Sequence, residues 1–514
     1  MPRVSLATPV LWTVLALTAL GAGLVSSLGP ATARATASPQ EPTPDAPARL
    51  SFDDLFDEER TGRRPTQTAW HPDGGALTYV WDDGDGEALW RMEAATGETT
   101  RLLEVAELAP PARDGRTESG LAEQDGGEEG GDRSGETLDA YHWSPAGDAL
   151  LLESGGDLWL LRPGAEDERR LARLTTTEAA EEDPAISPDG RKVAYVREAD
   201  LYLLELPEAG EGEAQHPSGA SGAAPEAAGA GTPSPPAERA LTADGEPGTT
   251  LNGTTSWVYW EEIWSRDATG FWWSPDSTRI AYYRFDETPV SEYTLLPDYR
   301  PEYPEPEHQR YPKAGTTNPE VRLGILELAT GETTWLDTDA PEEESYLARL
   351  HWTPDGSRVA VERLNREQDR LDLLLCDPAS GACDTALTDG HPTWVNLGKE
   401  TTFLPDGRLL WASERTGWRH LYLYSAPEDG LELLGALTSG PWAVTSVELA
   451  EDGQVFAAAH GTGTLGAARR RLLRIRFGDG ASLEPDVQEL AGGGADARGW
   501  HSARVAPGGG HLLH

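Results

Sequence analysis

Two adjacent carboxylates, Glu261 and Glu262, are the residues of this sequence best suited to hold a cation, because they stand in an unusually aromatic segment. Residues 256–275 read SWVYWEEIWSRDATGFWWSP and contain five tryptophans. Aromatic side chains bury large areas and fix local geometry, so this segment is predicted to be a rigid support. The three- to four-residue spacing of its first three tryptophans predicts a short helix, whose adjacent acids would flank one ligand from two sides. Two neighbouring acids are otherwise commonly part of a solvated surface, and composition alone leaves both interpretations open.

The charge of the chain favours a cationic partner. Its 87 Asp and Glu residues outnumber 42 Lys and Arg residues, which gives a formal net charge of −45. Nucleic-acid affinity depends on basic residues that neutralise phosphates, so nucleic acid is not an expected partner. The 11 histidines are scattered and none stands in a His-Glu-x-x-His arrangement. We therefore expect no metal site and no cofactor, whereas a peptide's ammonium end is a natural ligand for acidic groups.

Residues 1–37 are typical of an export signal. Arg3 gives a positive start, residues 10–25 are mostly apolar, and small residues follow at 31–33 and 35–37. Such a segment is either a cleaved signal peptide or an uncleaved N-terminal anchor, and both alternatives stay open. The protein is therefore expected to be exported, in the periplasm, outside the cell, or anchored to the membrane by this segment. Residues 38–49 are rich in proline and are predicted to be a linker.

The two cysteines, Cys376 and Cys383, flank the sequence DPASGA, which is a plausible hairpin turn. An oxidising compartment would permit a disulfide between facing strands. A pair of small, partly buried thiols is the alternative. A zinc site is not expected, because no second pair of ligands lies nearby.

A short turn motif recurs along the chain: an aromatic or apolar residue, a small residue, Pro, Asp or a substitute, and Gly. Proline presets φ, Asp bonds to backbone N–H groups and Gly adopts positive φ, so the motif predicts a tight turn. Apolar segments of strand length follow the turns, among them KVAYV at 192–196 and RIAYY at 279–283. The copies of the motif occupy residues 70–74, 143–147, 186–190, 273–276, 352–356, 403–407, 449–453 and 505–509.

Several short strands per repeat, at intervals of about 40 to 80 residues, predict an all-β protein built as a β-propeller. Eight turns predict about eight blades within residues 50–514, the last blade incomplete, with the acidic pair on a short helical excursion. Two stretches at about 113–138 and 208–238 are rich in Gly and in acids or small residues. They bury too little apolar surface to fold and are predicted to be disordered insertions.

The segment around the acidic pair resembles the dipeptidyl peptidase IV family, which has aspartate-Trp-Val-Tyr-Glu-Glu-Glu where this chain has residues 256–262. The Trp-Trp-Ser-Pro continuation of the family stands at 272–275. The resemblance covers about residues 50–514, and the motifs together are more specific than any one of them. Other similar segments are Tyr311-Pro312-Lys313-Ala314-Gly315, Asn318-Pro319, Trp394-Val395-Asn396, Ser413-Glu414-Arg415 and Gly417-Trp418-Arg419-His420-Leu421-Tyr422.

The resemblance implies the N-terminal propeller of a prolyl-oligopeptidase-type serine peptidase. Two glutamates of the family segment hold the substrate's α-ammonium, and they correspond to Glu261 and Glu262. Ser256 and Trp260 replace acids of the family pattern, and no position matches the family's arginine that contacts the substrate. No Gly-x-Ser-x-Gly motif occurs in the sequence, so no catalytic residue is assigned. In the family an α/β-hydrolase domain follows the propeller, and we expect this chain to be a truncated product that is inactive alone.

The expected function is therefore substrate anchoring and access control in a dipeptidyl peptidase IV-like serine exopeptidase. The full-length enzyme would release Xaa-Pro or Xaa-Ala dipeptides. Its expected partners are a peptide with a free N-terminus and the hydrolase domain, with a homodimer left open. The alternative is a non-catalytic exported β-propeller that acts as a binding or interaction module.

Overall fold

The structure is a computed structural model, and its described residues all fall within the unit Arg63–His514. The predicted export segment 1–37, the linker 38–49 and nearly all of the two predicted insertions lie outside the described residues. The described residues are 64–108, 137–164, 169–206, 237–296, 306–339, 345–427, 430–451, 453–461, 469–478, 483–491 and 500–514.

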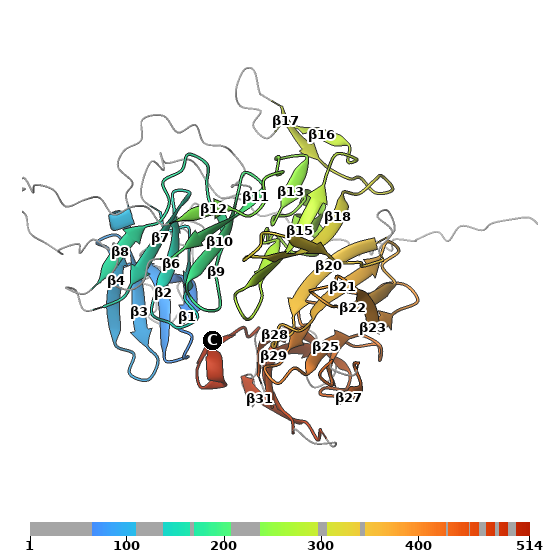
Figure 1. Ribbon diagram of the computed structural model, residues 1–514. Coiled ribbons are helices and arrows are strands. Elements are labelled where there is room, and N and C mark those ends of the chain that lie inside the picture. Colours follow the sequence, from blue (N-terminus) through green and yellow to red (C-terminus); the bar gives the residue numbers. More distant parts are fainter. Residues whose placement is uncertain are drawn as a thin grey trace, which may run out of the picture. The chain divides into compact units, whose positions relative to one another are not determined.

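The described residues form antiparallel sheets in which most strands are neighbours in the chain as well as in the sheet (Figure 1). A four-stranded meander of this kind is the blade of a β-propeller, and the prediction of an all-β propeller fold is confirmed. The described part contains seven sheets of four or five strands, a two-stranded sheet near the C-terminal residue and a separate hairpin, β16–β17.

The first three sheets contain β1 (Thr66–Trp70), β2 (Ala76–Asp82), β3 (Glu87–Glu93) and β4 (Thr99–Glu104); β5 (Ala140–Trp143), β6 (Leu150–Ser154), β7 (Asp157–Arg162) and β8 (Arg170–Arg173); and β9 (Glu182–Ile186), β10 (Lys192–Arg197), β11 (Asp200–Glu205) and β12 (Glu238–Ala240). The next sheet contains β13 (Thr250–Asn252), β14 (Phe271–Trp273), β15 (Arg279–Asp286), β18 (Glu320–Glu327) and β19 (Thr333–Trp335), and its hairpin contains β16 (Glu292–Leu295) and β17 (Glu307–Arg310).

The remaining sheets contain β20 (Ser345–Trp352), β21 (Val359–Asn365), β22 (Arg370–Cys376) and β23 (Cys383–Gly390); β24 (Thr402–Phe403), β25 (Leu409–Ser413), β26 (His420–Tyr424) and β27 (Leu433–Ala436); β28 (Trp442–Glu451), β29 (Gln454–Gly461), β30 (Arg471–Arg476) and β31 (Asp486–Ala491); and β32 (Arg504–Val505) with β33 (Leu512–Leu513). The helices are η2 (Val105–Leu108), η3 (Tyr259–Ile263) and η5 (Pro507–Gly509). No helix among the described residues has the length and apolarity needed to cross a membrane.

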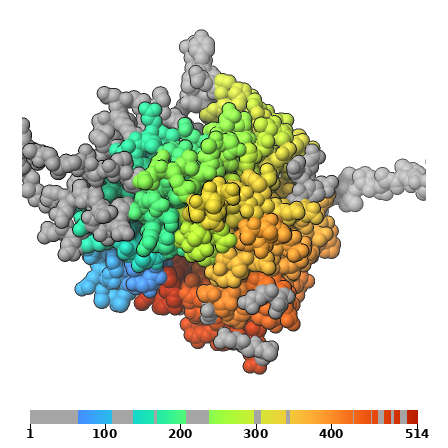
Figure 2. Space-filling view, in the orientation of Figure 1, coloured from blue at the N-terminus to red at the C-terminus, as the bar shows by residue number. Residues whose placement is uncertain are grey.

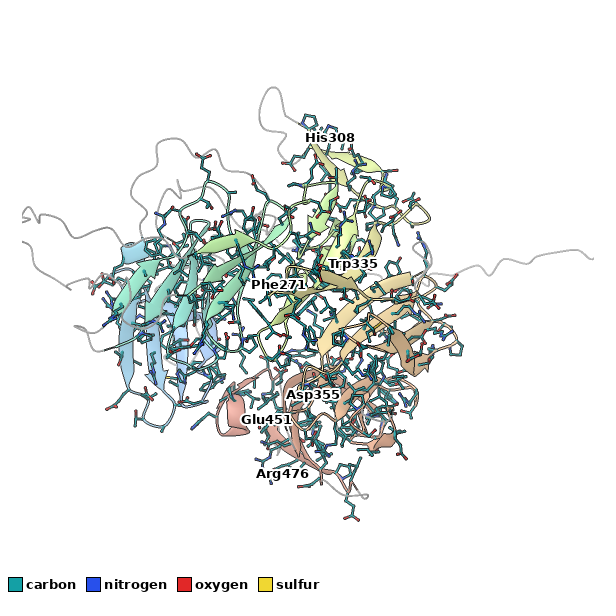
Figure 3. All side chains as sticks on the ribbon, viewed as in Figure 1. Phe271, His308, Trp335, Asp355, Glu451 and Arg476 are labelled. Atoms are coloured by element: carbon teal, nitrogen blue, oxygen red, sulfur yellow. A yellow bond between two sulfur atoms is a disulfide. The ribbon has the colours of Figure 1, made fainter. Side chains whose placement is uncertain are left out.

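The turn motif joins the first strand of a sheet to the second. In the copy after β20, the Thr353 hydroxyl donates to Asp355 Oδ1 at 2.6 Å and accepts the N–H of Arg358 at 3.0 Å. Asp355 lies at this turn (Figure 3), and the hydrogen bond from Thr353 helps to hold the pKa of its carboxyl below the ordinary value. The copy after β14 repeats these bonds with Ser274 and Asp276. The motif therefore ends one strand and starts the next with bonds that span only a few residues.

The tryptophan of the motif links a sheet to the one before it. Trp70, in the first copy, donates from Nε1 to the carbonyl of Arg504 in β32 at 3.1 Å. The last described strands therefore stand next to the first sheet as a preceding blade would, and the C-terminal residues border the first sheet in Figure 2. The same type of bond runs from Trp273 to the Ala185 carbonyl and from Trp352 to the Trp272 carbonyl, whereas Trp143 donates to the Thr78 hydroxyl.

Two residues predicted to end the insertions are described. Leu138 is buried, and its carbonyl accepts a hydrogen bond from Gln67 Nε2 at 2.7 Å. Glu238 begins β12 and forms an ion pair with Arg197 at 2.7 Å. The last residue of each predicted insertion is thus among the described residues and contacts the sheets.

Cys376 and Cys383 face each other across the β22–β23 hairpin and form a disulfide, with their Cα atoms 4.0 Å apart. Asp377 accepts the N–H groups of Ala379 and Ser380 within the turn. Of the two alternatives that the sequence left open, the structure has the disulfide.

Candidate functional site

The acidic pair lies in an excursion, residues 253–270, that divides the first strand of the β13–β19 sheet. β13 and β14 both pair with β15, with Asn252 opposite Arg284 and Phe271 opposite Tyr282. They are therefore two halves of one strand, and the chain leaves the sheet between them. The sequence predicts a short helical excursion, and the structure places it inside the first strand of a blade.

The two ends of the excursion meet at Gly253 and Gly270. The Gly270 N–H donates to the Gly253 carbonyl at 2.9 Å, and both glycines bond to the backbone of Tyr283 at 2.9 Å. A Cβ atom on Gly270 would lie 2.8 Å from the carbonyl carbon of Gly253. This close approach therefore requires glycine. Phe271 follows directly and is buried between the β9–β12 and β13–β19 sheets (Figure 3).

The excursion carries both acids on a short helix, as predicted. Residues 257–263 are helical, and η3 is a π-helix. The Ser256 carbonyl accepts the N–H groups of Tyr259 and Trp260, and the Trp264 N–H donates to the Tyr259 carbonyl at 2.8 Å. Single π-turns occur frequently at functional sites.

Two aromatic residues of the excursion fix it to β20, the first strand of the next sheet. Tyr259 is 2% exposed, and its hydroxyl accepts the N–H of Leu347 at 3.1 Å. Trp264 is 5% exposed, and its Nε1 donates to the Ala348 carbonyl at 2.7 Å. Both side chains belong to one buried cluster with residues of β15 and β20. The predicted aromatic support thus combines burial with hydrogen bonds to a neighbouring sheet.

These bonds reach a β-bulge. Leu347 pairs with Arg363 and Arg349 pairs with Glu362, so Ala348 is an extra residue in β20. A bulge leaves backbone groups without partners in the ladder. Buried backbone groups need partners, and here the excursion supplies them.

The two acids differ in their surroundings. Glu261 is half-buried and forms an ion pair with Arg266, whose Nε lies 3.0 Å from Oε2. The Arg266 guanidinium also lies over the ring of Trp260. Glu262 is exposed, and no hydrogen bond or ion pair joins it to another described residue. One carboxylate is therefore partly neutralised, whereas the other is available to a cation from outside the chain.

Ser256 and Trp260 stand where the family pattern has acids. Ser256 is buried, and its hydroxyl has no hydrogen-bond partner in the part of the chain that the structure describes. Trp260 is half-buried and presents its ring to Arg266. Both departures lower the negative charge of the helix, so Glu261 and Glu262 are its only acids.

The other segments that resemble the family gather in two places. The Tyr311 ring lies 4.4 Å from the Trp257 ring, so the YPKAG segment packs against the start of the helix. Asn396 Nδ2 donates to Glu414 Oε2 at 2.7 Å, which joins two further segments. A cavity of about 20 Å³ lies between these two segments, and Glu261 and Glu262 are not among its lining residues. Its size suits about one water molecule.

The other end of the excursion contacts the preceding sheet. Thr269 Oγ1 donates to Asp183 Oδ1 at 3.4 Å. The pKa of Asp183 is raised to about 7. Burial is the largest cause, and the neighbouring carboxylates of Glu182, Asp267 and Glu153 also contribute to the rise. Asp183 and Thr269 also line a cavity of about 540 Å³. No motif of the sequence distinguishes Asp183 from the many other acids.

The chemistry of the helix is that of a cation site. Carboxylates form short, strong hydrogen bonds with charged N–H donors, and an incoming cation relieves the repulsion between adjacent acids. Within the described residues, no three His, Cys, Asp or Glu side chains are grouped to hold a metal ion.

The family model of the dipeptidyl peptidase IV (DPP IV) N-terminal region matches residues 232–495, just over half of the chain, including the whole excursion. The chain belongs to the dipeptidyl peptidase IV family. Curated dipeptidyl peptidase IV relatives include a probable dipeptidyl peptidase 4 of Aspergillus fumigatus, 38% identical over 222 residues. One of Trichophyton verrucosum is 33% identical over 274 residues.

These matches cover 40% and 51% of the chain but only 28% and 32% of the relatives. The chain thus spans about three tenths of the length of these curated relatives.

Solved structures of the dipeptidyl peptidase IV type share the fold. Porphyromonas gingivalis dipeptidyl peptidase 4 matches with a TM-score of 0.67 and 21% identity, over 92% of this chain and 58% of that chain. A putative dipeptidyl aminopeptidase IV of Bacteroides ovatus matches with a TM-score of 0.60 and 18% identity, over 88% of this chain and 57% of that chain. At these identities the likeness shows the propeller fold alone.

The sequence motifs do not indicate two basic residues that lie beside the acidic helix, Arg349 and Lys399. Arg349 donates from Nε to the Gly398 carbonyl at 2.8 Å and from Nη2 to the Ile263 carbonyl at 3.3 Å. Lys399 Nζ lies 3.5 Å from the Trp264 carbonyl. Neither stands in a motif, and a basic residue in an alternating strand has the pattern of any solvent-facing position.

Proposed function

We propose that Glu261 and Glu262 anchor the α-ammonium of a peptide substrate in an exported dipeptidyl peptidase IV-like serine exopeptidase. The supporting observation is the exposed Glu262 carboxylate, which has no partner among the described residues and projects from a helix fixed by Tyr259 and Trp264. Such a carboxylate is desolvated little, and the helix that carries it is fixed before a ligand arrives. A peptide amino terminus is largely cationic near neutral pH and supplies charged N–H donors to both acids.

Arg266 already neutralises part of the charge of the proposed site. Its guanidinium bonds to Glu261 from one side and rests over Trp260. An ammonium that enters beside Glu262 adds a second positive charge to the carboxylate pair without displacing a buried group. Because Arg266 is exposed, it can also move aside at little cost.

The full-length enzyme would use this anchor to measure the distance to the scissile bond. With the ammonium fixed, a nucleophile of the hydrolase domain reaches the carbonyl after the second residue and releases Xaa-Pro or Xaa-Ala dipeptides. The propeller restricts access to unfolded peptide ends. The 514-residue chain alone is proposed to bind such peptides without cleaving them, so turnover of a Gly-Pro chromogenic substrate by the purified chain would contradict this part of the proposal.

The anchor is tested by calorimetry on the chain itself with a Gly-Pro-containing peptide and its N-acetylated form. We expect tighter binding of the free peptide, and the E261Q/E262Q variant should lose about tenfold or more in its affinity, the value of charged hydrogen bonds. The E484Q/D486N variant removes the same charge at two exposed acids near β31 and should bind as the wild type does. Equal binding of both peptides by the wild type would favour the rival function, an exported propeller that binds a different partner.

A further inference from the structure

We infer that Arg349 is a positioning residue of the ammonium site, because it joins the end of the acidic helix to the segment that connects β23 and β24. Its two hydrogen bonds, to the carbonyls of Ile263 and Gly398, connect residues that are far apart in the chain. Ile263 is the last residue of η3 and directly follows Glu262. This inference rests on the proposed function of Glu261 and Glu262.

The β20 bulge places the Arg349 side chain. Ala348 adds one residue to the strand, and Arg349 then pairs with Glu362. The same bulge offers its Ala348 carbonyl to Trp264 at 2.7 Å. The bulge therefore contacts the excursion in two ways. Its Ala348 carbonyl accepts a hydrogen bond from Trp264, and its Arg349 side chain donates one to Ile263.

Arg349 is well matched to this role. A guanidinium presents several N–H donors in a fixed plane, so it can bond two carbonyls at once. The carbonyl at the end of a helix carries partial negative charge and favours a cation. No carboxylate lies within ion-pair distance of Arg349 among the described residues, and its side chain bonds to the two backbone carbonyls. Glu362, opposite in the strand pairing, has His351 as its partner instead, at 3.3 Å.

Lys399 forms a weaker version of the same contact. Its Nζ lies 3.5 Å from the Trp264 carbonyl, one residue beyond Ile263. It belongs to the same 391–401 segment as Gly398, so two basic residues draw this segment and the helix end together. Arg349 makes the shorter bonds and should have the larger effect.

The Arg349 bonds affect the position from which the Glu262 side chain projects. The helix is short, and Glu262 has no partner of its own in the described structure. Its position is therefore set by the residues that hold Ser256 at one end and Ile263 at the other. Loss of the Arg349 bonds would leave Trp264 as the main contact at the Ile263 end, and the two carboxylates would meet one ammonium in a less fixed geometry.

The test compares the full chain with its R349M, R349K and R239M variants. Arg239 is the matched control, because it also donates across sheets to a backbone carbonyl, that of Leu328 at 2.8 Å, away from the acids. Calorimetry gives the affinity for the free and the N-acetylated Gly-Pro peptide. Hydrogen exchange by mass spectrometry reports on segments 257–264 and 391–401. Circular dichroism checks that each variant is folded.

We expect R349M to bind the free peptide about tenfold more weakly, the effect of losing one charged hydrogen-bond network, with the acetylated peptide unchanged. Exchange should rise in both segments together. R349K keeps the charge but reaches one carbonyl only, so its affinity should lie between those of R349M and the wild type. R239M should match the wild type in affinity and in the exchange of these two segments.

The outcomes separate the two proposals. A wild-type chain that binds both peptides equally would overturn the proposed function, and with it the role of Arg349 in ammonium binding. If the wild type prefers the free peptide and R349M keeps that preference at full strength, only the inference about Arg349 fails. If R349M does not fold, unaltered affinity in R349K would overturn the inference as well.

Discussion

The excursion is flanked by two β-bulges, one in β20 and one in β9, and they differ in how their polar groups are satisfied. In β20, the backbone of Leu347 and Ala348 bonds to Tyr259, Trp264 and Tyr283 at 2.7 to 3.1 Å. All three aromatic residues are buried. The Leu347 N–H and the carbonyls of Leu347 and Ala348 therefore bond to buried side chains.

The bulge of β9 contains an ionisable side chain, that of Asp183. The register shifts between Glu182 and Ala185, and Asp183 within this shift has a φ of 51°. Its carboxylate meets the excursion through one long hydrogen bond, 3.4 Å from Thr269. A left-handed conformation costs energy for a residue other than glycine, although Asp tolerates it better than most.

The two β-bulges thus contact the excursion through different kinds of group. The β20 bulge fixes the excursion through buried, uncharged hydrogen bonds, and its contribution should not depend on pH. The β9 bulge gathers acids beside a cavity, and its contribution should depend on their protonation.

The largest loss of stability is expected from Trp264→Ala, which removes the side chain that packs on the β20 bulge. Loss of a buried tryptophan and of its bond to Ala348 should lower the free energy of unfolding by about 4 kcal/mol. Urea denaturation measures the change. Trp394→Ala is the control, because Trp394 is 48% exposed, and it should cost less than about 1 kcal/mol. Similar losses in the two variants would contradict the proposed importance of the β20 contact.

Gly270→Ala should break the closure of the excursion at its base. The added Cβ would lie 2.8 Å from Gly253 and from the Thr254 carbonyl oxygen, so the strand halves must separate at a cost of about 3 kcal/mol. Gly510→Ala is the matched control, because an added Cβ there meets no atom within 4 Å. Thermal unfolding of both variants checks the prediction, and an unchanged melting temperature for Gly270→Ala would show that the base can open freely.

Asp183→Asn should change the pH dependence of stability. The folded pKa of about 7 lies above the ordinary value, so the folded state holds this proton more tightly than the unfolded state. The contribution of this proton to stability is therefore fully present below about pH 4 and is lost as the pH rises from about 4 to about 7. Asparagine mimics the protonated acid and tolerates the same φ. The variant should be about 2 kcal/mol more stable than the wild type at pH 8 and nearly equal at pH 4.

Urea unfolding at several pH values measures this difference. Asp355→Asn is the control, because the pKa shift of Asp355 has the opposite sign: the hydrogen bond from Thr353 helps to hold its pKa below the ordinary value. That variant should lose stability above about pH 4, where the wild-type carboxylate is charged and bonded. A pH profile of Asp183→Asn parallel to that of the wild type would refute the electrostatic account of the β9 bulge.

Tyr259→Phe gives the smallest expected effect, about 1 kcal/mol, because it removes only the acceptor of the Leu347 N–H while the ring stays packed. The loss should be the same at pH 5 and at pH 8, since no charge is involved. Tyr293→Phe serves as the control on a tyrosine that is 42% exposed. A pH-dependent loss in Tyr259→Phe would remove the distinction between the two bulges.

Much of the fold follows from short-range sequence patterns. The turn motif predicts where strands end, and the structure has such a chain reversal at residues 352–356, where Thr353 bonds to Asp355 and Gly356 within the turn. The segments KVAYV and RIAYY lie in β10 and β15. The site is predicted less completely. Glu261 and Glu262 lie on a short helix as expected, but the sequence does not indicate that Arg266 bonds to only one of them.

The sequence by itself determined the all-β class, the turn positions and the presence of two adjacent acids on an aromatic helix. The tertiary structure decided that the helix interrupts a strand, that a bulge in β20 receives it, and that Arg349 and Asp183 stand at its two flanks. The reason is the range of the interactions. Turn chemistry acts between near neighbours, whereas the bonds that fix the excursion join residues 84 to 88 positions apart, and only the packing of adjacent sheets brings these residues together.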